Sequence, residues 1–136
     1  MMDVRKMCEK AGNCHGENMN CAQSVLCGLS EITGLDDESA RCVAAGFGGG
    51  MRCGSICGAV SGAIMAIGLA KGHDDVRCGK PQSEVSELTK SLISEFKEKY
   101  GYINCADLLR STNGQKKCSE YIDFCVTAVA SLLENK

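Results

Sequence analysis

The residues of this sequence best suited to redox or metal chemistry are its cysteines, of which there are eleven in 136 residues. Four of them, Cys21, Cys57, Cys105 and Cys118, stand at or near positions where a helix is predicted to begin. The unpaired amides and the dipole at a helix N-terminus stabilise an anion, which lowers the pKa of a thiol. A thiolate is both the nucleophile of thiol–disulfide exchange and the form of cysteine that binds metals. These positions are therefore candidates for redox or metal chemistry.

The spacing of the cysteines argues against the familiar short motifs. No CxxC pair occurs, so the thioredoxin motif, the usual zinc ribbon and the standard ferredoxin run are absent. Cys53 and Cys57 are the closest pair, and they could share a metal or a disulfide if their helix begins early enough. A site with four cysteines must therefore be assembled from separate helices.

Local sequence predicts how two of the four thiols are positioned. Residues 20–22 and 104–106 both read Asn-Cys-Ala. Asn104 is a good N-cap, and it would place Cys105 at the first helical position. Asn20 would be the N-cap that places Cys21 at the first helical position if the second helix begins one turn later than residue 18.

A central helix over about residues 54–71 organises the rest of the chain. It carries no charge between Arg52 and Lys71, and small residues recur at every fourth position: Gly54, Gly58, Gly62, Ala66 and Ala70. Such a stripe lets another backbone approach closely. Ser55 is the candidate N-cap, with Cys57 in the first turn. The uncharged run lies at the low edge of what spans a bilayer and lacks an aromatic belt, so we expect no stable membrane insertion.

The remaining pattern predicts helices on both sides of the central one, over about 3–11, 18–33, 36–45, 83–100, 104–110 and 116–134. Turns are expected at 12–17, which holds Cys14 and His15, and at the glycine-rich residues 46–50. Residues 71–80 read as a loop, in which His73, Asp74, Asp75 and Cys78 could be imagined as a metal cluster. We predict one all-α domain over residues 1–136, a bundle of about five to seven helices around the central helix.

Bulk composition narrows the functional classes. A net charge of -2 and few aromatic residues argue against nucleic-acid binding. The first residues do not resemble an export signal, and the number of cysteines is odd. We therefore expect a cytoplasmic protein with free thiols rather than a secreted disulfide framework. The glycine-rich loop follows no predicted strand and lacks a nucleotide-binding motif. The small-residue stripe could also seat a second copy of the chain, so a homodimer is a further expectation.

Several motifs together resemble a known family. Residues 20–22 (NCA), 47–51 (FGGGM) and 57–62 (CGAVSG), followed by two later cysteines, are similar to the bacterial family of redox-active proteins named for its C_GCAxxG_C_C signature. The likeness covers nearly the whole chain and implies that the hallmark cysteines are Cys21, Cys57, Cys105 and Cys118. Cys125, one heptad further along the last helix, is a rival for the fourth place, and Cys53 is a candidate addition to the site.

Three functions remain open at this point. The first is a cytosolic thiol-redox or electron-transfer protein, a candidate thiol oxidoreductase, in which one hallmark cysteine attacks, a neighbour resolves and an unidentified redox partner completes the cycle. The second is a Cys₄ site for zinc, copper(I) or an iron–sulfur cluster, expected to be all-thiolate because both histidines are predicted in loops. The third is a structural or partner-binding helical domain with cysteines as buried apolar residues and no cofactor.

Overall fold

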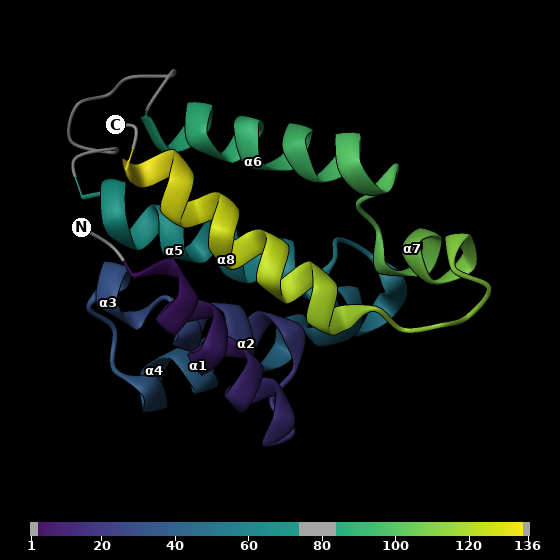
Figure 1. Cartoon of the computed structure of the whole chain (residues 1–136), viewed down its shortest axis with the longest axis horizontal. Helices are drawn as coiled ribbons and strands as arrows, with labels where there is room; N and C mark the ends of the chain where they lie inside the picture. The colour runs from purple at the N-terminus through teal and green to yellow at the C-terminus, as the bar shows by residue number, and fades with distance from the viewer. Residues whose placement is uncertain (1–2, 74–83, 135–136) are drawn as a thin grey trace.

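The computed structural model describes residues 3–73 and 84–134, and this part of the chain is built of helices (Figure 1). The helices are α1 (Val4–Gly16), α2 (Cys21–Gly28), α3 (Ser30–Thr33), α4 (Asp37–Val43), α5 (Gly58–Lys71), α6 (Glu84–Tyr100), α7 (Cys105–Ser111) and α8 (Cys118–Glu134). Within the described ranges there is no strand, only an isolated antiparallel bridge between Ile56 and Asn104. The predicted all-α class is confirmed. Asp74, Asp75, Cys78 and the predicted helix start at Ser83 lie outside the described residues.

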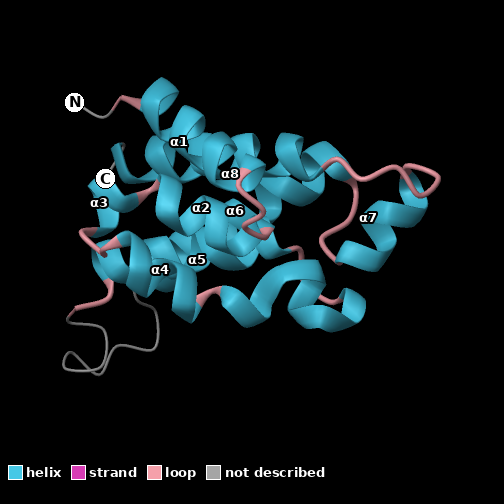
Figure 2. Cartoon of the chain, turned by 90° about the horizontal axis from the view of Figure 1, so that it is seen from below, coloured by secondary structure: helices cyan, strands magenta, loops and turns pink. Residues whose placement is uncertain are grey.

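Helix α5 lies at the centre of the bundle, as predicted. It packs against α2, α6 and α8 and also touches α3, while α1 packs on α2 and α8 (Figure 2). The largest fully buried side chains come mainly from α2, α5, α6 and α8, among them Leu26, Ile67, Leu92, Phe96 and Val129. Figures 1 and 2 both show α7 at one end of the molecule, beside the start of α8.

The small-residue stripe of α5 does bring a second backbone close. A β-carbon on Gly62 would lie 2.6 Å from the carbonyl oxygen of Ala22, and one on Gly58 would lie 3.2 Å from the amide nitrogen of the same residue. The crossing of α5 and α2 therefore depends on two missing side chains. Gly54 departs from the prediction, because it precedes the helix and has a positive φ of 74°.

Helix α1 is longer than the sequence suggested. The predicted helix ended near residue 11, but α1 continues to Gly16 and so includes Cys14 and His15, which we had expected in a turn. Met7, Ala11 and Cys14 recur at helical spacing and are buried. Packing of this face against α2 outweighs the low helix propensity of Gly12.

Helix α2 begins one turn later than its predicted limit, with Asn20 as its N-cap. The helix predicted over 18–33 is interrupted at Leu29 and resumes as α3, which ends at Gly34 in the left-handed conformation. The glycine stop signal is thus confirmed. None of the helices in the described part of the chain has the length and apolar character needed to cross a bilayer.

Candidate thiol site

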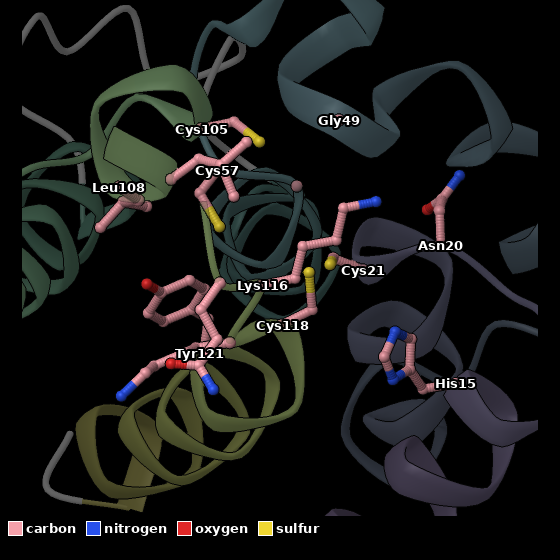
Figure 3. Close-up of a pocket in the computed structure, with 14 residues that line it drawn as sticks. His15, Asn20, Cys21, Gly49, Cys57, Cys105, Leu108, Lys116, Cys118 and Tyr121 are labelled. Carbon is pink, nitrogen blue, oxygen red and sulfur yellow. The ribbon is translucent and has the colours of Figure 1, made fainter. Parts of the chain in front are cut away.

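Four cysteines from four helix N-termini line one cavity (Figure 3). Cys21, Cys105 and Cys118 are the first residues of α2, α7 and α8, and Cys57 is the N-cap of α5. The cavity has a volume of about 270 Å³. These are the four positions that the helix-start argument selected, and the fold brings them together from separate parts of the chain.

Cys21 is held in place by the capping of α2. The side-chain oxygen of Asn20 accepts a hydrogen bond from the Gln23 amide, and the Gln23 side chain accepts one from the Asn20 amide, both at 2.9 Å. The side-chain amide of Asn20 also donates to the Ala45 carbonyl at 3.1 Å. This capping box fixes the first turn of α2 and ties it to the segment before α5. Cys21 is 9% exposed at the cavity wall.

Cys57 and Cys105 are brought together by the antiparallel bridge. The Cys57 amide donates to the Ile103 carbonyl at 2.8 Å, and the Cys105 amide donates to the Ser55 carbonyl at 2.6 Å. Because residues 55–57 are extended in this pairing, α5 starts at Gly58, and the prediction of Ser55 as its N-cap is wrong. Cys57 takes that place instead and is 4% exposed.

A left-handed turn precedes this bridge. Gly49, Gly50, Met51 and Arg52 all have φ between 58° and 64°. A β-carbon on Gly50 would lie 2.3 Å from the carbonyl oxygen of Ser55, so this position admits only glycine. Gly49 lines the cavity, so the glycine-rich turn passes close to the cysteine site.

Cys118 is the one thiol of the four whose pKa is lowered. A hydrogen bond from the Cys21 thiol, with the nearby Lys116 ammonium adding to it, lowers the Cys118 pKa from 9.0 to about 6 against the opposing effect of partial burial. The two sulfurs lie side by side in Figure 3, within 4.8 Å of each other. A thiolate with an adjacent thiol donor is the arrangement that thiol–disulfide exchange requires.

The other three thiols are shifted in the opposite direction. The hydrogen bond to Cys118, together with burial, raises the pKa of Cys21 above its ordinary range. Burial raises the pKa of Cys57 to about 11 although the Ala59 and Val60 amides act against it, and burial also raises the pKa of Cys105. The prediction that all four helix starts lower the thiol pKa therefore fails at three of them. The main cause is the hydrogen bond with Cys118 at Cys21 and desolvation of the charged form at Cys57 and Cys105.

His15 joins the site, which the sequence did not indicate. Its imidazole lies on the last turn of α1, and one ring nitrogen lies with the sulfurs of Cys21 and Cys118 in a group whose atoms are all within 4.8 Å of one another. Two thiolates and an imidazole could hold a soft or borderline cation such as zinc. The expectation that no histidine lies near the hallmark cysteines is wrong, since α1 extends past its predicted end.

The other described cysteines lie away from the cavity lining. Cys53 is exposed, and its thiol donates to the Gly50 carbonyl at 3.5 Å. Cys125, the rival for the fourth place, is 0% exposed, and burial raises its pKa well above the ordinary value. Cys14 and Cys27 are also buried, and the Cys27 thiol donates a hydrogen bond to the Asp37 carbonyl at 3.7 Å.

Among known proteins, one family resembles this chain over most of its length. The model of the family described as "Putative redox-active protein (C_GCAxxG_C_C)" matches residues 19–132. This range contains all four thiols of the cavity and begins after His15. No curated protein and no solved structure matches the chain significantly.

Proposed function

Because the chain belongs to the C_GCAxxG_C_C family, we propose that it carries out thiol–disulfide exchange, with Cys118 attacking and Cys21 resolving. The observation that carries the proposal is the approach of the Cys21 and Cys118 sulfurs, which lie within 4.8 Å of each other in the cavity. Their interaction favours the thiolate at Cys118 and the thiol at Cys21, which are the starting states of nucleophile and resolving group. The proposal assumes a reducing compartment such as the cytoplasm, where thiols persist.

The exchange proceeds in two displacements. The Cys118 thiolate attacks one sulfur of a substrate disulfide, forms a mixed disulfide and releases the first substrate thiolate. Cys21 then gives up its proton, which a released thiolate takes up, and attacks the Cys118 sulfur. The second substrate thiolate leaves, and a Cys21–Cys118 disulfide remains. Two electrons have passed to the substrate, and a partner dithiol returns the protein to its reduced form by becoming a disulfide itself.

Serine variants test the two roles separately. Cys118→Ser is expected to abolish exchange with 2-hydroxyethyl disulfide, whereas Cys21→Ser is expected to accumulate the mixed disulfide on Cys118, visible as added mass on the intact protein. Cys42→Ser is the matched control, because Cys42 is exposed on α4 away from the cavity. An undiminished rate in Cys118→Ser would contradict the proposal.

Metal binding is a second candidate function, and His15 is the observation that favours it. With Cys21 and Cys118 it offers three protein ligands, and Cys57 and Cys105 line the same cavity. Zinc sites with three protein ligands and one open position are typically catalytic. Copper(I) and an iron–sulfur cluster remain the alternatives that an all-thiolate site would take.

Cobalt(II) serves as the probe for this candidate, since thiolate coordination gives it a charge-transfer absorption. The reduced protein should bind one equivalent with a tetrahedral spectrum, and His15→Ala should weaken that binding markedly. His73→Ala is the control because His73 lies beside a separate groove between α4 and α5. Equal affinity in His15→Ala would favour the Cys₄ site, and no absorption change in the wild type would exclude a thiolate metal site for this ion.

A further inference from the structure

Charge is unevenly distributed around the thiol cavity. Its lining includes the side chains of Lys116, Lys117 and His15, and no aspartate or glutamate among the described residues. The Lys116 ammonium acts to lower the pKa of both Cys118 and Cys105. Neither lysine forms an ion pair with another residue of the described ranges. The cavity is thus a positive region of a chain whose net charge is -2.

The neighbouring carboxylates are directed elsewhere. Asp107 on α7 pairs with Arg110 and accepts a hydrogen bond from the Asn104 side chain. Glu120, one turn into α8, lines a separate groove between α6 and α8 together with Glu95 and Asp123. Among the described residues, no acidic side chain in the cavity lining therefore neutralises the positive charge of the two lysines.

The size of the cavity limits what can reach the thiols. A volume of about 270 Å³ is just below the range typical of sites for small organic ligands. Cys118, the attacking thiol, is only partly exposed in the cavity lining, so a substrate sulfur must enter the cavity to reach it. A short aliphatic disulfide satisfies this condition, whereas a disulfide held rigidly in a folded protein does not.

We propose that the preferred substrate is a small anionic disulfide, with its carboxylates facing Lys116 and Lys117 while one sulfur meets Cys118. This inference rests on the proposed exchange function and names its substrate class. The reaction is the one already written: each turnover forms the Cys21–Cys118 disulfide and releases the two halves of the substrate as thiols or thiolates. The lysines attract the carboxylates of the incoming substrate. They also stabilise the negative charge that passes from Cys118 to the first leaving thiolate.

Three short aliphatic disulfides that differ in charge provide the test: dithiodiglycolate with two carboxylates, neutral 2-hydroxyethyl disulfide, and cystamine with two ammonium groups. Each rate with the protein is divided by the rate with free 2-mercaptoethanol under the same conditions, so that intrinsic reactivity cancels. The normalised rate should be highest for the dianion and lowest for the dication. At low ionic strength the difference between them should be on the order of tenfold or more, and salt should reduce it.

Paired charge variants decide whether the lysines are responsible. Lys116→Gln/Lys117→Gln should bring the three normalised rates together, even if all of them fall because Cys118 loses a neighbouring cation. Lys90→Gln/Lys97→Gln removes the same charge from exposed positions on α6 and should leave the order unchanged.

The outcomes separate the two proposals. Exchange that proceeds with equal normalised rates for the three disulfides, or a preference that survives in Lys116→Gln/Lys117→Gln, overturns the substrate assignment and leaves the exchange function standing. A wild-type protein that exchanges with none of the three overturns the exchange function, and the substrate assignment with it.

Discussion

The backbone of Ala22 touches the face of Gly62 so closely that no side chain fits between them: a β-carbon there would lie 2.6 Å from the Ala22 carbonyl oxygen. One turn earlier, a β-carbon on Gly58 would lie 3.3 Å from the β-carbon of Cys21. The crossing of α5 and α2 therefore sets the position of Cys21 relative to the start of α5. The two glycines contribute to the site although neither carries a reactive group.

Alanine substitutions within α5 measure this contact. Gly62→Ala forces the two helices apart and is expected to lower the free energy of unfolding by about 1–3 kcal/mol and to slow exchange. Gly68→Ala is the matched control, because a β-carbon at Gly68 meets nothing within 4 Å. Because Gly68→Ala replaces a helical glycine without a clash, it should raise the free energy of unfolding by about 0.5–1 kcal/mol. Urea denaturation of both variants gives the comparison, and equal effects would rule out the close crossing.

The two Asn-Cys-Ala segments are expected to differ in how much they stabilise their helices. Asn20→Ala removes both the capping box and the bond to the Ala45 carbonyl, so it should cost about 1–2 kcal/mol of unfolding free energy. Asn104 makes no side-chain cap and only a 3.4 Å contact with Asp107. Asn104→Ala should therefore cost less, and thermal denaturation would show a lower Tm for Asn20→Ala than for Asn104→Ala. The reverse order would contradict the assignment of the caps.

The pH dependence of alkylation should identify Cys118 as the ionised thiol. With its pKa lowered to about 6, roughly nine-tenths of Cys118 is thiolate at pH 7, against about one-hundredth for a thiol at 9.0. The rate of iodoacetamide labelling, followed residue by residue by mass spectrometry in protein stripped of metal, should reach half its plateau near pH 6. It should fall below that pH, because protonation removes the nucleophile.

A variant pair at Cys21 tests the cause of this shift. Cys21→Ala deletes the hydrogen-bond donor and should move the half-plateau of Cys118 upward by about one pH unit or more. Cys21→Ser retains a hydroxyl donor at the same place and should restore much of the shift. If both variants kept the wild-type profile, Lys116 and the start of α8 would have to account for the lowered pKa instead.

Removing Cys125 should leave the chemistry intact. Its side chain is 0% exposed and absent from the cavity lining, so Cys125→Ala should cost about 1–2 kcal/mol of stability through lost packing while exchange continues. Cys118→Ala should have the opposite profile, with little loss of stability and no exchange. Loss of exchange in folded Cys125→Ala would make Cys125 the fourth functional cysteine.

Short-range sequence signals predicted the helices and the location of Cys21, Cys57, Cys105 and Cys118 at or near helix starts, because capping residues and apolar periodicity act within a few positions. The glycine stripe likewise predicted the close approach at Gly58 and Gly62. Contacts between distant segments were not predictable. The pairing of residues 55–57 with 103–105 moves the start of α5 and makes Cys57 its N-cap.

The same limit explains the errors in the chemistry of the site. The position of His15 depends on how far α1 extends along α2, which packing decides. The direction of each pKa shift depends on the burial of the thiol and on which other thiol lies next to it. The positions of helix starts in the sequence indicate neither. A hint was available in the sequence, since Met7, Ala11 and Cys14 continue one apolar face past Gly12 and place His15 in the same helix.

Cys21 and Cys118 join α2 to α8, two helices that lie far apart in the sequence. During synthesis Cys21 leaves the ribosome well before Cys118, and no CxxC neighbour is present to activate it in the meantime. Only when α8 docks on α2 and α5 does Cys118 receive its hydrogen bond and its lowered pKa. Under the proposed function, folding itself therefore generates the nucleophile, because its thiolate depends on a contact between two helices that are far apart in the sequence.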